Sequence, residues 1–175
     1  WMLGPEGIAV FYSRPEARRQ LKSIQQGWRV YDDPFNFDRS DWSEPDSAKR
    51  FEIGSPNMMG IFALDACVDL LLEQDMEFVG ERVLAHTALL AEGIQSIPGL
   101  RMRSNTSDQR RSGILSFTTG SLDENQRIHR QLLEQGIVGA CRGEGIRWSP
   151  HFYQATSDME KALAQLTQIA TRKAS

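Results

Sequence analysis

The chain has 175 residues, of which 40% are hydrophobic and 25% charged, and its formal net charge is −3 at pH 7. These values are ordinary for a globular protein, and the length suffices for one sizeable domain or for part of a larger one. The small negative charge gives no electrostatic reason to expect nucleic acid or an anionic membrane surface as a partner.

Cysteine use and hydropathy indicate the compartment. Cys67 and Cys141 are the only cysteines and lie in unrelated contexts, which argues against a disulfide framework and favours a reducing cytoplasm. No apolar run approaches the roughly 18 residues that a membrane span needs. We therefore predict a cytoplasmic protein without a membrane partner. The sequence also contains no zinc-ligand spacing, Walker loop or dinucleotide-binding glycine motif, so we predict no metal site.

The first quarter of the chain combines one apolar run with a long polar stretch. Ile8–Tyr12 follows turn residues and is apolar throughout, which predicts a strand buried on both faces of an α/β sheet. A short helical pattern covers residues 14–26. The polar stretch 27–49 contains several aromatic residues, including Trp28 and Trp42. Because disordered segments are poor in aromatic residues, we expect this stretch to wrap over a surface, such as that of a second subunit.

The segment Arg50–Asn57 precedes the most apolar part of the sequence, Met58–Leu72. Ser55 is a good helix N-cap, and Pro56 suits the first helical position. The Ser55 hydroxyl and the free N–H groups of a helix start also form a seat for an anion. Ser55 therefore has two interpretations, a helix cap or an anion ligand. Because the following helix is apolar on most faces, we predict that it is buried, with Cys67 as a small core residue.

The second half of the chain alternates short strands and helices. A helix is predicted from about Glu77 to Pro98–Gly99, and two later helices are predicted to open at capping boxes beginning with Ser121 and Ser157. The predicted strands are 100–103, 113–118, 137–141 and 145–149. We expect three parts: residues 1–56 from a larger domain with an interface loop, 57–98 as connecting helices, and 99–175 as a small α+β domain whose short sheet is covered by helices.

Two arginines flank the turn Gly143–Gly145 and are candidates for a ligand site. A guanidinium group binds both oxygens of a carboxylate at once. Arg147 is the better candidate because its sequence neighbours are mostly apolar or aromatic, and a buried charge needs a partner. The alternative is that Arg142 and Arg147 are surface residues with Glu144 as an incidental partner. No activating neighbour marks Cys141 as a nucleophile.

Taken together, four stretches resemble the class V aminotransferase-fold enzymes, a superfamily that includes cysteine desulfurases, kynureninases and isopenicillin N epimerase-like proteins. Trp1–Val10 resembles the segment that follows the Schiff-base lysine, and Arg50–Asn57 resembles the R-F-E-x-G-[ST]-x-N signature. Arg147–Tyr153 resembles the R-x-S-x-x-x-Y element, and a helix opening near Thr156 follows it as in the family.

This resemblance implies an α/β enzyme of fold type I that uses pyridoxal 5′-phosphate, acts on a small amino acid and forms a homodimer. By resemblance, Ser55 would contact the cofactor phosphate of the neighbouring subunit, and Trp28 would reach the partner's cofactor region. Arg147 would bind the α-carboxylate of the substrate. The family's lysine would stand immediately before Trp1, so the resemblance implies that this chain by itself lacks the catalytic lysine and is inactive.

The resemblance leaves the reaction open. Only four residues separate Arg142 from Arg147, and Cys141 precedes them, whereas cysteine desulfurases carry their catalytic cysteine in a longer loop. We therefore favour an aminotransferase-like activity over a desulfurase. The alternatives are a kynureninase-like or epimerase-like lyase or isomerase, and a non-catalytic domain that retains the fold for protein interaction.

Overall fold

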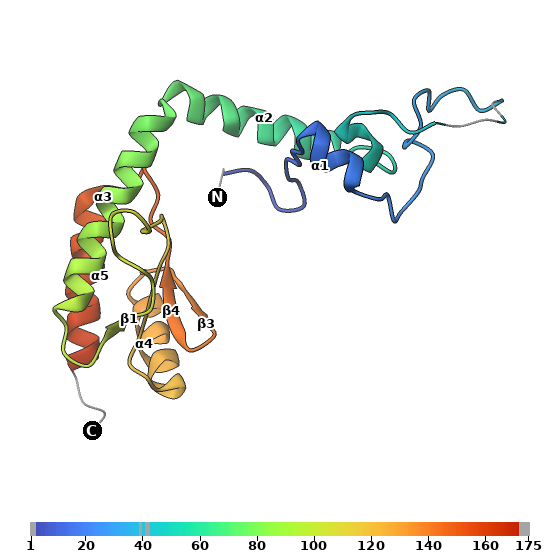
Figure 1. Cartoon of the computed structure of the whole chain (residues 1–175). Helices are drawn as coiled ribbons and strands as arrows, with labels where there is room; N and C mark the ends of the chain where they lie inside the picture. The colour runs from blue at the N-terminus through green and yellow to red at the C-terminus, as the bar shows by residue number, and fades with distance from the viewer. Residues whose placement is uncertain (1–2, 39, 41–42, 172–175) are drawn as a thin grey trace. The chain divides into compact units, whose positions relative to one another are not determined.

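The computed structural model describes residues 3–38, 40 and 43–171, and it divides the chain into two compact units, residues 1–73 and 74–175 (Figure 1). The predicted interface residue Trp42 and the first two residues of the family-like N-terminal stretch, Trp1 and Met2, lie outside the described residues. The division falls within the predicted pair of connecting helices, and the three-part organisation stays a prediction.

The N-terminal unit contains little regular structure before its last helix. Its elements are α1 (Pro15–Gln20), the 3₁₀ helix η1 (Ala48–Phe51) and α2 (Met58–Glu73). The Cys67 thiol on α2 donates a hydrogen bond to the Leu3 carbonyl at 3.2 Å. This contact holds the start of the chain against α2, and it leaves Cys67 half-buried instead of in a core as predicted.

The strand predicted at Ile8–Tyr12 is wrong. This segment is not a strand in the structure, and its side chains are largely exposed, 73% for Val10 and 80% for Tyr12. A strand needs a neighbouring strand to satisfy its backbone N–H and C=O groups. The described residues of the N-terminal unit supply no such neighbour, so the apolar run stays irregular. Phe11 instead packs edge-on against Phe51, with ring centroids 5.2 Å apart.

The start of α2 corrects the predicted helix cap. Asn57, not Ser55, is the capping residue: its side-chain oxygen accepts the Gly60 N–H at 3.0 Å, and its carbonyl accepts the Ile61 N–H at 2.9 Å. Asn is as good a cap as Ser, and its position two residues later lets Pro56 precede the helix instead of opening it. The Ser55 hydroxyl is thereby left out of the cap.

Helix α2 is not buried as predicted. Only Gly60 and Leu71 are buried among its residues, whereas Met59 is 85% exposed and Phe62 is 68% exposed. The prediction was based on a helix that is apolar nearly all round, which normally lies inside a protein. The described residues of the N-terminal unit contain too little regular structure to cover such a helix.

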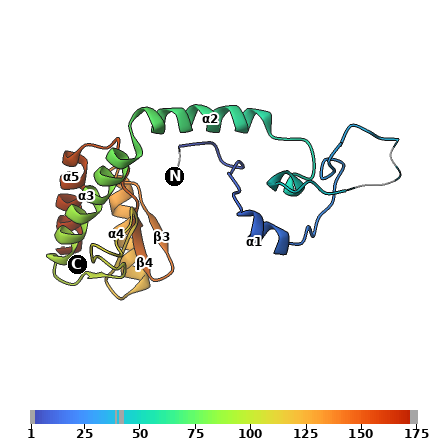
Figure 2. The ribbon, with the colours of Figure 1, turned by 45° about the horizontal axis from the view of Figure 1, so that its top comes forward.

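Among the described residues, the C-terminal unit contains one antiparallel sheet and three helices, which confirms the predicted short sheet covered by helices (Figures 1 and 2). The strand order is β1-β2-β4-β3. In both views α3 and α5 lie side by side, with β3 and β4 on the opposite side of this unit. The elements in chain order are α3 (Met76–Gln95), β1 (Arg101–Met102), β2 (Leu115–Thr118), α4 (Leu122–Glu134), β3 (Ala140–Arg142), β4 (Gly145–Trp148) and α5 (Thr156–Thr171).

The core lies between one face of the sheet and the three helices. Phe117 of β2 is opposite Ile146 of β4, and both side chains are fully buried. The Phe117 and Trp148 rings meet edge to face, with centroids 5.1 Å apart. Alternation along the strands puts Leu115 on the same face. Apolar residues of the helices complete this core: Leu90, Ala91, Ile94, Ile128, Leu132, Met159, Ala162, Leu166 and Ile169.

Capping and an ion pair position α4. The Ser121 hydroxyl accepts the Glu124 N–H at 3.4 Å, which confirms the predicted cap. The Glu124 carboxylate binds the Arg127 guanidinium at 2.6 Å, and this hydrogen-bonded pair lowers the pKa of Glu124 and raises the pKa of Arg127. Arg127 also donates to the Ile169 carbonyl at 3.3 Å, so the pair connects α4 to α5.

The other predicted capping box is shifted. Helix α5 begins at Thr156, one residue before the Ser157 predicted as its cap. The Asp158 carboxylate accepts the Ala155 N–H at 2.9 Å, which places the reciprocal capping bond two residues earlier than predicted. In the part of the chain that the structure describes, no helix has both the length and the apolarity required to cross a membrane.

Candidate functional site

The second face of the sheet carries the candidate site. Residues directly opposite each other in an antiparallel pair point to the same face. Arg147 of β4 is opposite Ser116 of β2 and Ala140 of β3. This face is therefore the reverse of the one that carries Phe117 and the core. Because the core helices pack on the Phe117 side, we call this reverse side the open face of the sheet.

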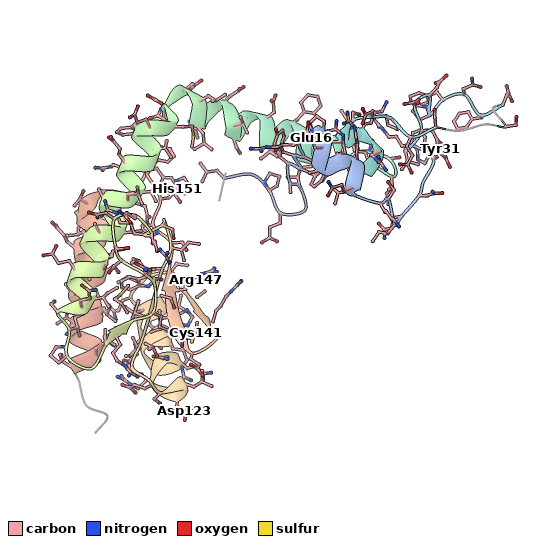
Figure 3. All side chains as sticks on the ribbon, viewed as in Figure 1. Glu16, Tyr31, Asp123, Cys141, Arg147 and His151 are labelled. Carbon is pink, nitrogen blue, oxygen red and sulfur yellow. The ribbon has the colours of Figure 1, made fainter. Side chains whose placement is uncertain are left out.

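Arg147 occupies the middle of the open face, between β2 and β3. Its side chain is half-buried, and its Nε atom is buried without a hydrogen-bond partner among the described residues. Figure 3 labels Arg147 and Cys141 on neighbouring strands, on the side of the unit away from α5. A half-buried cation whose donors lack a protein acceptor is suited to bind an anion from outside the chain.

Three further arginines belong to the same face. Arg142 lies two residues beyond Ala140 along β3, so its side chain shares the face of Arg147. Arg101 of β1 is opposite Thr118, which shares the face of Ser116 for the same reason. Arg103 follows β1 and donates to Glu144 at 3.0 Å. Glu144 is thus committed to Arg103, and the structure records no contact of Glu144 with Arg142 or Arg147 among the described residues.

Gly145 leaves room on the open face for the side chains of Ser116 and Arg103. A Cβ atom built there would lie 2.8 Å from the Phe117 carbonyl oxygen and 3.1 Å from Cδ of Arg103. The Arg103 side chain therefore passes directly over Gly145 on its way to Glu144. Any larger residue at this position would displace the backbone of β2 or this side chain.

Asn125 holds the hairpin that carries Arg142 and Arg147, and the sequence analysis missed it. Its side chain is fully buried and makes four hydrogen bonds. It accepts from the backbone N–H and the hydroxyl of Thr119 at 2.9 and 3.0 Å. It donates to the Thr118 hydroxyl at 2.9 Å and to the Glu144 carbonyl at 3.0 Å. The sequence signal was a short amide in the first turn of α4, three residues before the buried Ile128.

The predicted cofactor residues lie in the N-terminal unit. Ser55 is exposed, and its hydroxyl has no hydrogen bond within the described part of the chain. Trp28 is 40% exposed, and its ring lies 5.7 Å from that of Phe35. Because the two units are described separately, their assembly with Arg147 into one site stays a prediction. Cys141 is half-buried on β3, opposite Ile146, and its thiol has no hydrogen-bond partner among the described residues.

A metal site is not supported by the arrangement of potential ligands. Over residues 3–38, 40 and 43–171, no three His, Cys, Asp or Glu side chains come together in a group that could hold an ion. The open face instead carries arginine side chains, which are positively charged. It is therefore suited to bind anionic groups.

Comparisons with known proteins indicate the family of the chain. The family model for aminotransferase class-V matches residues 2–146. The chain is 30% identical to a cysteine desulfurase of Serratia proteamaculans over 121 residues, which cover 68% of this chain and 28% of that protein. It is 26% identical to a kynureninase of Deinococcus radiodurans over 172 residues, covering 95% of this chain and 41% of that protein.

Solved structures establish the fold. The complex of the cystine C–S lyase C-DES with its reaction product cysteine persulfide is similar with a TM-score of 0.81 and 22% identity. The match covers 95% of this chain and 44% of that chain. The chain thus spans less than half the length of the relatives that it matches.

Proposed function

The chain belongs to the aminotransferase class V family, and on this premise we propose that it supplies the carboxylate-binding and phosphate-binding residues of a pyridoxal 5′-phosphate-dependent enzyme that acts on a small amino acid. The observation that carries the proposal is the half-buried Arg147, whose buried Nε has no partner in the described part of the chain. A substrate α-carboxylate would accept from two donors of this guanidinium group and fix the orientation of the amino acid.

The proposal covers what the relatives' chemistries have in common. One curated relative is a desulfurase and the other a kynureninase, and the substrate of each reaction is an amino acid. When bound, pyridoxal phosphate supplies an electron sink for the bonds around the amino-acid α-carbon. Arg147 would hold the carboxylate in place and so orient the bonds of the α-carbon, in an aminotransferase-like or a kynureninase-like reaction.

The residues of the N-terminal unit fit the phosphate end of the cofactor. The Ser55 hydroxyl is exposed and has no hydrogen bond within the described chain, and it lies two residues before the cap of α2. A hydroxyl next to a helix start is well placed to donate to a phosphate oxygen. We propose that Ser55 holds this phosphate for the neighbouring subunit, with Trp28 beside the same cofactor.

Replacing Arg147 by Gln tests the carboxylate role. We expect the 175-residue chain to bind L-alanine but not L-alaninamide, which lacks the carboxylate. The variant should bind L-alanine at least about tenfold more weakly, because a charged hydrogen bond is lost. NMR of the arginine Nε–H groups measures this directly, since the Arg147 signal should shift with L-alanine. Arg130→Gln on α4 is the control. Equal binding of alanine and alaninamide would contradict the proposal.

We also propose that the chain forms a homodimer through α2. The support is the exposed apolar surface of this helix, which includes Met59 and Phe62. We expect sedimentation to give twice the chain mass of 19.8 kDa. Phe62→Asp should shift the mass to the monomer, because a carboxylate would be buried in the interface. Asp69→Asn, on an exposed position of the same helix, should not. A wild-type chain that stays monomeric at high concentration would refute the dimer.

A further inference from the structure

The open face carries more positive charge than one carboxylate requires. Arg101, Arg103, Arg142 and Arg147 share it, and the one acidic partner that the structure records for them among the described residues is Glu144, bound to Arg103. Arg142 is exposed, and its side chain has neither a hydrogen bond nor an ion pair in the part of the chain that the structure describes. Cations that share a surface repel one another unless anions join them.

The strand register places Arg142 next to Arg147. Arg147 is opposite Ala140, and Arg142 is opposite Gly145, so the two arginines are diagonal neighbours on adjacent strands. Such positions are roughly 7–8 Å apart at Cα, within reach of long side chains. Gly145 lies opposite Arg142 on β4, and the Arg103 side chain covers it on this face, with Cδ 3.1 Å from where a Cβ atom of residue 145 would be.

The other arginines are less well placed. Arg103 has its guanidinium group committed to Glu144 at 3.0 Å. Arg101 lies on β1, at the other edge of the sheet from β3, and two strands separate it from Arg142. Among the described residues of the open face, Arg142 is therefore an unpaired cation on a strand that pairs directly with the strand of Arg147.

We propose that Arg142 is a specificity-determining residue that binds a second acidic group, carried on the side chain of the amino-acid substrate. The substrate class is then an amino acid with an acidic side chain, whose α-carboxylate binds Arg147 and whose side-chain anion binds Arg142. The inference rests on the proposed role of Arg147. A neutral side chain of the same shape would leave Arg142 without a counter-charge, and it would lose one charged hydrogen bond.

Binding of L-glutamate and L-glutamine to the 175-residue chain tests this inference, because the two ligands have the same shape and differ in side-chain charge. By titration calorimetry or NMR, we expect the wild type to prefer glutamate about tenfold. Arg142→Gln should abolish the preference by weakening glutamate binding while leaving glutamine binding unchanged. Arg130→Gln, an exposed arginine on α4, is the matched control and should keep the preference. O-phospho-L-serine against L-serine shows whether the second group is a phosphate or a carboxylate.

The outcomes separate this inference from the proposed function. Arg147→Gln should weaken the binding of glutamate and of glutamine to the same extent, since both ligands carry the α-carboxylate. If Arg147→Gln has that effect but the wild type binds both ligands equally, the proposed function stands and the role of Arg142 is refuted. If Arg142→Gln weakens the binding of both ligands equally, Arg142 does not distinguish the charged side chain of the ligand from the neutral one, and its proposed role is refuted. If no ligand binds saturably, both proposals are refuted for this chain.

Discussion

Replacing Phe117 by alanine is expected to lower the free energy of unfolding of the C-terminal unit by about 3–5 kcal/mol. Phe117 is fully buried on β2, opposite Ile146, and its ring packs edge-on against Trp148. The substitution removes the ring from the centre of the core. It leaves a cavity between the sheet and the helices that their movement would fill only in part. Urea unfolding followed through the NMR signals of amides in residues 74–171 measures the loss for this unit alone.

Ile114 provides the matched control for Phe117. It lies next to β2 and is 44% exposed, so Ile114→Ala should cost less than about 1 kcal/mol. Phe117→Leu should fall between the two, since it keeps part of the apolar volume. A loss for Phe117→Ala as small as that for Ile114→Ala would show that the ring is not part of a packed core.

Replacing Asn125 by alanine is expected to cost about 2–4 kcal/mol, the second largest effect that we predict. The change removes four hydrogen bonds from a fully buried side chain. It leaves the Thr119 N–H and the Glu144 carbonyl without this partner, and each unsatisfied buried group is costly. Urea unfolding gives the loss in free energy.

Hydrogen exchange of the Thr119 amide tests the Asn125 role locally. In Asn125→Ala this amide should exchange much faster, because its acceptor is gone. Gln126→Ala, an exposed neighbour on α4, should change neither the exchange nor the stability beyond about 0.5 kcal/mol. Slow exchange at Thr119 in the Asn125 variant would contradict the hydrogen-bond network. A loosened hairpin in that variant should also weaken L-alanine binding at Arg147, although Asn125 lies on α4 and not on a strand of the open face.

Much of the C-terminal unit was predictable from local chemistry. Ser121 caps α4 as predicted. Three of the predicted strands contain an observed strand, and the fourth, 137–141, overlaps β3 without containing it. These features depend on interactions between residues that are close in the sequence. The local sequence pattern therefore suffices to predict them.

The N-terminal unit shows where local patterns mislead. Ile8–Tyr12 has the composition of a buried strand, and α2 has that of a buried helix, yet both are exposed in the structure. An apolar pattern indicates that burial would stabilise a segment. Whether the segment is buried depends on a second apolar surface, which the segment itself does not provide. The prediction of the α2 cap was wrong for a different reason. Ser55 and Asn57 are both good capping residues, and only the path of the backbone selects Asn57.

The sequence by itself determined most elements of the small domain and the Ser121 cap of α4, and it singled out Arg147 as a candidate anion ligand. Only the tertiary structure decided which residues share a face with Arg147. It assigned Glu144 to Arg103, placed Arg142 beside Arg147 across β3 and β4, and made Asn125 the buried anchor of their hairpin. The physical reason is that strand register and buried hydrogen bonds join residues that are distant in the chain, and no local pattern encodes that pairing.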